Sequence, residues 1–333
     1  MGIKSLTQII KRESPNSITH ENLYKLSGKK IAVDASLIIY QQLLRHKLLK
    51  NKKGEITNHI TGLFYKLVKY LALNIELIFI FDGKPPDMKQ ECVDGRKKKA
   101  QDAKDKMDAC QNVDEKNELE KSTLRLTKSM IDNVKKLLDY MGVSYIHNDV
   151  GEGEAIASEL CRVGFVDYVL TEDMDTMVYG CPNLIRTCLD KSLKRPDIIS
   201  IINYNEMIKG FNLTDDQFIK FCILCGCDYC SNVPKVGNTT ALKMIKKHNT
   251  VEEIIETYKD KYEFPDNYAE LFNKSYKIFM MYKDKINVNE LVISKPNKDM
   301  GGLIKFLVND IEMDELRVQK AVKKLQNTLG NNI

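Results

Sequence analysis

Three acidic residues stand where apolar runs end, and this placement is the first sign of chemistry in the sequence. Asp34, Asp82 and Asp173 close the runs KIAVD, IELIFIFD and YVLTED. Such runs are typical of buried parallel strands, whose carboxyl ends lie along one edge of a sheet. Because a buried carboxylate without a partner is costly to desolvate, these residues predict a cation at that edge.

Four more acids can join them: Glu152, Glu154 and Asp175 at the same rim, and Asp228 from the helical part of the chain. The first two follow Gly151 and open a helix expected at residues 155–163, where the positive end of the helix dipole favours anions. The 46 acids of the 333-residue chain should give about six pairs two residues apart by chance, so spacing alone is weak evidence. Their position at strand ends and at a helix start is the stronger indication.

A set of carboxylates without His or Cys suits hard cations, above all Mg²⁺, which binds a few carboxylates together with water and phosphate. Mn²⁺ is an expected substitute. Two such ions about 4 Å apart hydrolyse phosphodiesters, because one lowers the pKa of an attacking water and the other stabilises the leaving oxygen. A single acid is more often a helix cap or a surface ion pair. Seven together favour a two-metal hydrolytic centre.

Helices must alternate with the strands that position these acids. Apolar residues recur at helical spacing in residues 37–44, 59–71 and 123–141, between and after the apolar runs. This alternation predicts a doubly wound α/β fold with a parallel sheet. Beyond residue 203 the chain reads as helical throughout, with apolar helical spacing at 218–225, 239–247 and 251–258.

Residues 84–136 differ in character, since they hold 14 Lys or Arg against 11 Asp or Glu. Such a run alone is most often a solvated, mobile helical insertion. Its position directly after Asp82 favours a functional role.

Composition limits the class of protein. Hydrophobic residues make up 43% of the chain and charged residues 29%, which predicts an ordered globular protein. The net charge of +5 requires a nucleic-acid surface to come from local clusters. Nine cysteines with no recognisable export signal predict free thiols in a reducing intracellular compartment, nuclear or cytoplasmic. No apolar run is long enough to cross a bilayer, so no membrane partner is expected.

Six blocks in order give the chain its resemblance to the flap endonuclease and XPG-type nuclease family: MGI, VDAS, FDGKPP, EGEA, TEDMD and CDYC. The resemblance spans nearly the whole chain. It implies a PIN-like 5′ nuclease core with a helical arch at about 84–136 and a helix-two-turn-helix at about 218–248. It also implies an N-terminal nuclease region at 1–105, an internal nuclease region at 122–253 and a helical C-terminal part at 254–333.

The resemblance implies that the seven acids are metal ligands, directly or through water. It further implies that Lys89 and Arg96 contact the scissile phosphate from the first helix of the arch, through which the 5′ flap passes. Residues seven apart lie on one helix face, whereas without the resemblance both would read as solvated charges. Tyr40 would stack on a base beside the cut, worth about 1 to 3 kcal/mol; the alternative is a core tyrosine.

Duplex contacts are expected after residue 231, because residues 231–248 contain no acid and a turn feeding a helix N-terminus can bind phosphate. The candidate contacts are Lys235, Gly237, Asn238, Thr239 and Lys243. The resemblance implies a monovalent cation here, although Lys235-Val236-Gly237 replaces the family's Gly-x-Gly. Thr57 is a candidate contact for a one-nucleotide 3′ flap, in a loop where Lys52 and Lys53 replace the family's acids.

Two features remain outside this scheme. Cys222, Cys225, Cys227 and Cys230 are close enough in sequence to suggest a zinc site, but ordinary buried thiols are the preferred interpretation. The tail has the Gln326 and Leu329 of a sliding-clamp motif without its paired aromatics, which normally supply most of the buried anchor, so clamp binding has weak support. We expect a monomer.

The sequence thus predicts a structure-specific, metal-dependent DNA endonuclease that cleaves 5′ flaps and other branched DNA in replication and repair, with 5′-phosphate products. A 5′ to 3′ exonuclease or an RNA-directed relative would use the same metals and phosphates. A non-catalytic junction-binding protein is the third reading, and its expected sign, the loss of several acids, is absent from the sequence.

Overall fold

The chain passes repeatedly between two folding units. The computed structural model describes residues 2–3, 5–45, 47–84, 87–110, 112–147, 151–193 and 195–330. Unit 1 consists of Met1–Lys25, Gly83–Lys89 and Asp149–Leu291, and unit 2 of Leu26–Asp82, Gln90–Asn148 and Val292–Ile333. The units therefore interleave along the sequence, whereas the predicted regions 1–105, 122–253 and 254–333 are nearly sequential.

Strands in unit 1 lie side by side in the order β1, β7, β6, β5. Their bounds are Ile18–Asn22 for β1, Ile198–Asn203 for β7, Asn183–Thr187 for β6 and Tyr168–Leu170 for β5. β5 and β6 pair in parallel, whereas β1 and β6 both pair antiparallel to β7. The apolar run before Asp173 is thus a strand, as predicted, but its neighbours make the sheet mixed.

Helices in unit 1 pack around an aromatic core. They are α1 (Leu6–Glu13), α7 (Gly153–Arg162), α8 (Asp175–Val178), α9 (Tyr204–Phe211), α10 (Asp215–Cys225), α11 (Asn238–Lys247), α12 (Val251–Tyr258) and α13 (Tyr268–Lys285), with 3-10 helices η1 (Pro15–Ser17), η3 (Asp87–Lys89) and η4 (Val288–Glu290). Thr214 and Gln217 form a capping box that starts α10. Buried Phe211, Phe218 and Phe221 then pack ring against ring.

Unit 2 has strands in the order β2, β3, β4, β8. Their bounds are Lys30–Asp34 for β2, Glu76–Phe81 for β3, Ser144–His147 for β4 and Ile293–Ser294 for β8. β2 and β3 run parallel, as their apolar runs predict, and β4, which was not predicted from the sequence, continues the parallel order; β8 is antiparallel to β4. The short β8 is a departure from the helical reading of everything beyond residue 203, because a two-residue strand has no detectable periodicity.

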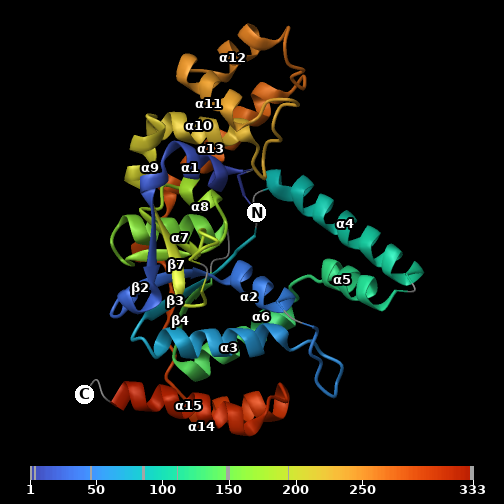
Figure 1. Cartoon of the computed structure of the whole chain (residues 1–333), viewed down its shortest axis with the longest axis vertical. Coiled ribbons are helices and arrows are strands. Elements are labelled where there is room, and N and C mark those ends of the chain that lie inside the picture. Colours follow the sequence, from blue (N-terminus) through green and yellow to red (C-terminus); the bar gives the residue numbers. More distant parts are fainter. Residues whose placement is uncertain are drawn as a thin grey trace. The chain divides into compact units, whose positions relative to one another are not determined.

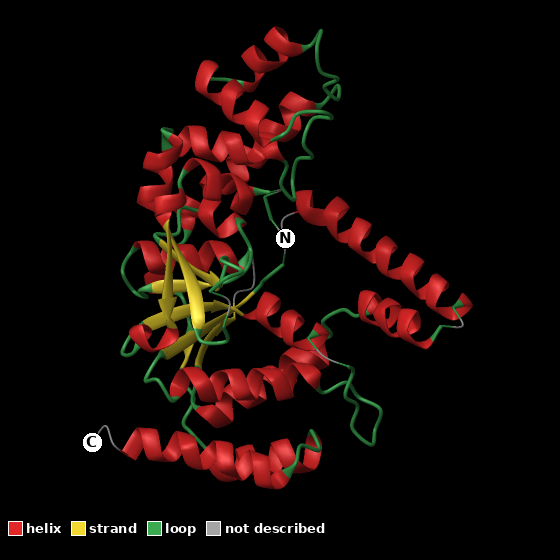
Figure 2. Ribbon diagram, viewed as in Figure 1, coloured by secondary structure: helices red, strands yellow, loops and turns green. Residues whose placement is uncertain are grey.

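Helices in unit 2 cover the strands and carry the insertion (Figures 1 and 2). They are α2 (Ala35–Leu44), α3 (Asn58–Leu71), α4 (Gln90–Ala109), α5 (Val113–Thr123), α6 (Lys128–Met141), α14 (Met300–Lys305) and α15 (Glu315–Gly330), with η2 (Leu23–Leu26) at the unit boundary in sequence and the π-helical turn η5 (Phe306–Asp310). α3 contacts α2, α6 and α15, and α14 contacts α6 and α15. Within the described residues, no helix has the length and apolarity needed to cross a membrane.

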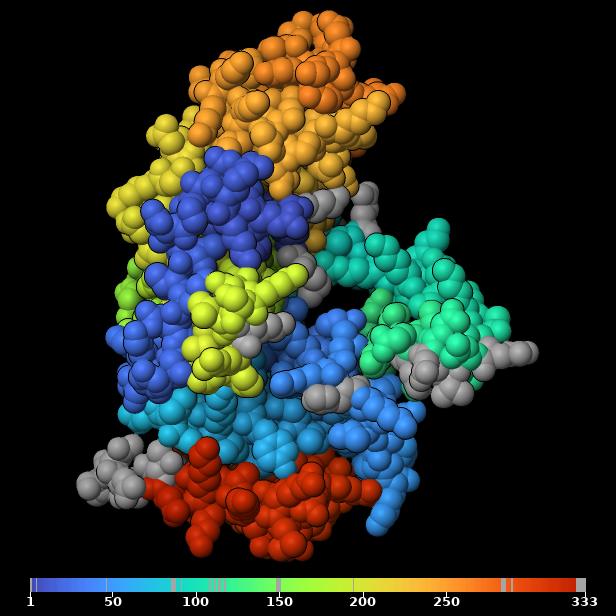
Figure 3. All heavy atoms as spheres, viewed as in Figure 1, coloured from blue at the N-terminus to red at the C-terminus, as the bar shows by residue number. Residues whose placement is uncertain are grey.

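The charged insertion is a pair of helices, α4 and α5, which pack against each other (Figure 3). The predicted helix at 123–141 begins later, at Lys128, because Thr127 caps α6 by accepting a hydrogen bond from the Met130 N–H. α6 buries Val134, Leu137 and Leu138. It therefore belongs to the packed body of unit 2, and the helical pair ends at Thr123, before the predicted limit of residue 136.

One buried histidine makes the stability of unit 2 depend on pH. His59 on α3 is 1% exposed and neither ring nitrogen has a hydrogen-bond partner. Burial lowers the pKa of His59 to about 4 from its ordinary 6.5. Between pH 6.5 and 4, His59 is therefore protonated in the unfolded chain and neutral in the folded one. The free energy of unfolding falls as the pH drops through this range.

We expect His59→Leu to remove this loss. The difference should reach about 3 kcal/mol in the free energy of unfolding near pH 4 and vanish above pH 6.5. Urea unfolding across this range measures it, with a substitution at exposed His147 as control. Equal pH profiles for the wild type and His59→Leu would contradict the prediction.

Candidate functional site

The start of α7 presents two acids in unit 1. Glu152 is the N-cap residue of α7 but its side chain accepts no capping hydrogen bond, and Glu154 lies in the first helical turn. Glu152 is only 3% exposed. The helix start predicted at residue 155 is thus confirmed within two residues. The carboxylate of Glu152 does not cap the helix, and instead accepts a hydrogen bond from Lys89.

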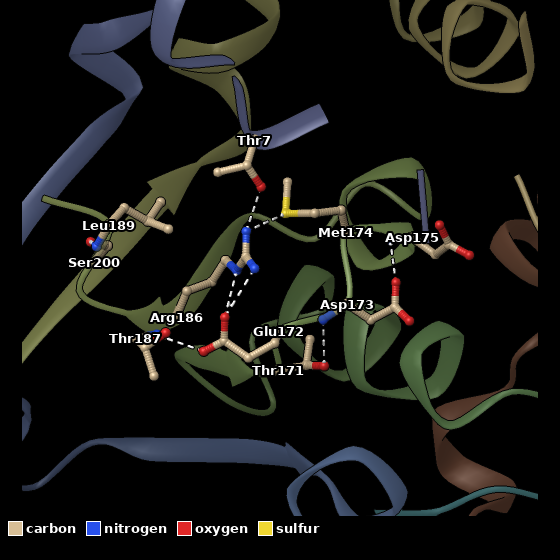
Figure 4. A network of polar contacts seen from close by, with 10 residues as sticks. All are labelled: Thr7, Thr171, Glu172, Asp173, Met174, Asp175, Arg186, Thr187, Leu189 and Ser200. Atoms are coloured by element: carbon tan, nitrogen blue, oxygen red, sulfur yellow. Dashed lines mark hydrogen bonds and ion pairs between the residues drawn. The ribbon is translucent and has the colours of Figure 1, made fainter. Parts of the chain in front are cut away.

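The segment between β5 and α8 holds two more acids in fixed positions. The Asp173 N–H donates to Thr171 Oγ1 over 3.1 Å, and the Asp175 N–H donates to Asp173 Oδ1 over 3.1 Å (Figure 4). Asp173 and Asp175 are 7% and 3% exposed. These local hydrogen bonds hold residues 171–175 in the turn that follows the strand, as Figure 4 shows.

Lys89 joins these elements to the turn after α10. Its Nζ lies 2.6 Å from Glu152 Oε1 and 3.5 Å from Asp228 Oδ2. The Lys89 and Asp228 side chains are each 15% exposed. A single ammonium group therefore bridges a helix start and a turn more than seventy residues away, which brings the EGEA and CDYC motifs together.

The electrostatics of this cluster favour a cation. Burial raises the pKa of Asp173, and burial together with the charges of Asp173 and Asp228 raises the pKa of Asp175 well above its usual value. Burial works against a charged Lys89, but the carboxylates of Glu152, Glu154 and Asp228 raise its pKa. The negative charges of the acids repel one another, and they stabilise the positive charge of Lys89.

Asp175 provides the clearest test of whether the residues suit a metal. Its Oδ1 is buried and has no hydrogen-bond partner, and a buried carboxylate oxygen without a donor calls for a cation. Within the described part of the chain, no three acidic, histidine or cysteine side chains are gathered closely enough to form a ready-made metal site. Mg²⁺ does not require one, because it keeps several waters and takes only a few carboxylates. The donor set fits such an ion.

Gly2, in the MGI block, lies at the site, although no role there was predicted for it from the sequence. A Cβ atom at this position would lie 2.0 Å from Asp173 Oδ1, 2.6 Å from Asp175 Oδ1 and 3.0 Å from the Asp175 backbone nitrogen. Gly2 also has φ +79°. The N-terminal segment therefore lies directly against the two acids, and only a residue without a side chain fits there.

Asp34 and Asp82 belong to unit 2. They lie at the same end of two neighbouring parallel strands, β2 and β3, as predicted. Asp34 is 3% exposed, and its Oδ1 accepts the Leu37 N–H over 3.0 Å to cap α2. Asp82 is exposed. The structure thus gathers five of the seven acids in unit 1 and pairs the other two at one strand edge of unit 2.

Lys89 and Arg96 are not on one helix as predicted. Lys89 ends η3 and belongs to unit 1, whereas α4 begins at Gln90. Arg96 lies on α4, where its backbone carbonyl accepts a hydrogen bond from Arg125 Nη2 over 2.5 Å. The shared helix expected for these two residues thus begins one residue after Lys89, and their contact with the scissile phosphate stays a prediction.

Lys235 and Gly237 lie between α10 and α11 in unit 1, and the other three candidate duplex contacts, Asn238, Thr239 and Lys243, lie on α11. Lys235, Gly237, Thr239 and Lys243 are exposed, and Asn238 Nδ2 donates to the Ser5 carbonyl over 3.4 Å. Lys235 has φ +63°, a left-handed conformation that favours glycine. The backbone shape that Gly-x-Gly would supply is thus present with a lysine in its first position.

Lys235→Gly should therefore stabilise the protein. A non-glycine residue in this conformation costs about 1 to 2 kcal/mol, part of which glycine returns through the greater freedom of the unfolded chain. We expect a net gain of about 0.5 to 1 kcal/mol in the free energy of unfolding. Urea denaturation measures it. Lys243→Gly, inside α11, is the matched control and should lose about 1 kcal/mol; a loss at both positions would refute the prediction.

Two predicted DNA contacts in unit 2 differ in exposure. Tyr40 is half-buried on α2. Thr57 is only 5% exposed, because its N–H donates to the Leu49 carbonyl over 2.9 Å and the hairpin closes over it. Burial counts against a direct contact between the Thr57 side chain and DNA. Lys52 and Lys53, in the same hairpin, are exposed.

The cysteine cluster behaves as packing. Cys222, Cys225 and Cys230 are buried, and burial raises the pKa of Cys225 to about 12 and that of Cys230 to about 11. Their thiols are therefore protonated at neutral pH, as befits small apolar side chains. At the tail, Gln326 is exposed on α15, and the side chain of Leu329 lies outside the described residues, as do Pro85 and Pro86 of FDGKPP.

Known proteins are similar to this chain in sequence and in fold. A family model for the XPG N-terminal domain matches residues 1–103, and one for the XPG I-region matches residues 142–228. Flap endonuclease 1-A of Sorghum bicolor is 35% identical over 98% of this chain and 87% of its own length. Flap endonuclease-1 from Methanococcus jannaschii is 27% identical with a TM-score of 0.71, over 95% of this chain and 97% of that one.

The fold is also similar to that of a protein with a much lower sequence identity. The catalytic core of Rad2 in complex with a DNA substrate is 21% identical, with a TM-score of 0.71 over 97% of this chain and all of that one. These structural matches confirm the predicted class of α/β nuclease core, with the sheet mixed instead of wholly parallel.

Proposed function

The chain belongs to the flap endonuclease family, and on this basis we propose that it hydrolyses a phosphodiester of branched DNA beside a 5′ flap. The observation that carries the proposal is the acidic cluster of unit 1. Glu152 and Asp228 pair with one partly buried lysine, Lys89, and the charges of Glu154, Asp173 and Asp175 also act on it. Such a concentration of carboxylates suits the binding of cations and phosphate.

We further propose that the cations are two Mg²⁺ ions, for which Mn²⁺ can substitute. The proposed donors are the seven acids, Asp34, Asp82, Glu152, Glu154, Asp173, Asp175 and Asp228. When bound, the ions would lower the pKa of an attacking water and stabilise the leaving oxygen. The products would carry a 5′ phosphate and a 3′ hydroxyl.

The protein's own residues bind and orient the DNA in this proposal. Lys89 already donates to Glu152 and, once cations neutralise the acids, its ammonium would contact the scissile phosphate. Arg96 on α4 would add a second phosphate contact. The exposed residues Lys235, Thr239 and Lys243 would hold the duplex through its backbone, a contact that carries no base specificity.

A cleavage assay on four labelled substrates tests the proposal: a 5′ flap, a nicked duplex, a duplex with a free 5′ end and the same flap in RNA. We expect Mg²⁺-dependent cutting at the flap base, with little product in EDTA. Mononucleotide release from the free 5′ end as the main reaction would replace the proposal with an exonuclease. Preference for the RNA flap would identify an RNA-directed enzyme, and binding without turnover a junction-binding protein.

A further inference from the structure

Arg186 connects two separate segments of unit 1 that both lie against the acidic cluster. Its Nε and Nη2 lie 3.0 and 2.9 Å from Glu172 Oε2, and its Nη1 donates to Thr7 Oγ1 over 2.6 Å and to Met174 Sδ over 3.1 Å (Figure 4). The Arg186 side chain is only 12% exposed. One guanidinium on β6 thus makes four polar contacts.

Glu172 shows how the first of these segments is held. Its Oε1 accepts the Thr187 N–H over 2.7 Å while Oε2 faces the guanidinium. Both carboxylate oxygens are therefore occupied by β6, on the side of the turn opposite to Asp173 and Asp175 (Figure 4). Arg186 and Thr187 thus hold the turn through Glu172, while Asp173 and Asp175 lie on its other side.

Thr7 shows how the second segment is held. It lies on α1, five residues after Gly2, and Gly2 is in close contact with Asp173 and Asp175. The hydrogen bond from Arg186 therefore fixes the start of α1 relative to the turn, and with it the segment that covers the two acids.

We propose that Arg186 is a positioning residue for the cation site: it sets the separation of Asp173 and Asp175 and holds the N-terminal segment over them, without itself touching metal or DNA. The inference rests on the proposed function for the identity of the site. Only a guanidinium can do this, because its planar fork presents five donors. A lysine ammonium would retain one or two of the contacts and lose the bidentate geometry.

The test measures metal binding in addition to cleavage. Calorimetry on the full chain without DNA gives the affinity for Mn²⁺. Flap binding is measured in EDTA. Single-turnover cleavage gives the Mg²⁺ concentration at which the rate is half its maximum. For Arg186→Gln we expect Mn²⁺ affinity to fall about 10-fold or more, which is about 1.4 kcal/mol, and the Mg²⁺ requirement to rise in parallel. Flap affinity should stay within about 3-fold, and Arg186→Lys should recover only part of the loss.

Arg162→Gln is the matched control. Arg162 makes an equally short two-point pair with Glu159 on α7 of the same unit, but its side chain is 46% exposed, against 12% for Arg186. It should leave the Mn²⁺ affinity unchanged. Thr7→Val removes a single hydrogen bond and Thr7→Ser retains it, so these two variants test the second segment even where Arg186→Gln fails to fold.

The inference is overturned if Arg186→Gln, or Thr7→Val where the arginine variant fails to fold, binds Mn²⁺ like the wild type while melting at a lower temperature. That result assigns the arginine a structural role alone. Failure of the proposed function looks different: the wild type would bind Mn²⁺ in an Arg186-dependent manner and leave every flap uncut.

Discussion

Asp175→Asn is expected to abolish flap cleavage and at the same time to raise the melting temperature of the metal-free protein. The buried Oδ1 of Asp175 has no hydrogen-bond partner and faces the neighbouring charge of Asp173. An amide removes the unpaired charge, which benefits the metal-free fold. It also removes a proposed ligand, and the loss of a metal contact worth several kcal/mol slows the reaction by about 10³-fold or more.

The opposite signs of the two effects make the experiment decisive. Single-turnover cleavage and thermal melting in EDTA are measured together, and flap binding in EDTA should remain. Added Mg²⁺ should stabilise the wild type more than the variant. Asp260→Asn, an exposed carboxylate of the same unit, should change neither quantity. Wild-type turnover by Asp175→Asn would remove this carboxylate from the proposed ligands.

Gly2→Ala should have the second largest effect, about a 10²-fold fall in the cleavage rate, as expected for a displacement of about 1 Å in an active site. The added methyl group would lie 2.0 Å from Asp173 Oδ1 and 3.0 Å from the backbone of Asp175. Either the N-terminal segment must lift away or the turn must shift. Both movements disturb the separation of the two acids.

Gly54→Ala separates this clash from the cost of the backbone conformation. Gly54 has the same φ of +79°, but nothing lies within 4 Å of a Cβ built there. Each alanine should lose about 1 to 2 kcal/mol of stability through its left-handed backbone, while only Gly2→Ala should lose activity. Equal activities for the two variants would show that the N-terminal segment has no part in the site.

Much of the site could be predicted because its chemistry is local in sequence. The strands before Asp34, Asp82 and Asp173 have unbroken apolar runs, and Glu152 stands at a helix start marked by glycine, so each acid was placed from its own neighbours. Five of the seven acids lie in unit 1, where Lys89 pairs with Glu152 and Asp228, and the convergence of all seven on one site stays a prediction.

The features that sequence reasoning missed depend on contacts between distant residues. Arg186 and Thr7 are 179 positions apart, and no local pattern links them. The family resemblance implied a place for Lys89 on the first helix of the arch, whereas Lys89 ends η3 and pairs with Glu152 and Asp228, and α4 begins at Gln90. Likewise, the burial of Thr57 follows from a hairpin closed by backbone hydrogen bonds, which side-chain patterns do not reveal.

The cap that Asp34 provides for α2 has an evolutionary consequence. Its Oδ1 accepts the Leu37 N–H, and an asparagine carbonyl at this position would do the same, since the two residues cap helices about equally well. One nucleotide change could therefore give Asp34→Asn, which replaces the negative charge by a neutral amide without loss of stability at the helix cap. Descendants that recognise branched DNA without cutting it would be as well folded as their enzymatic ancestor.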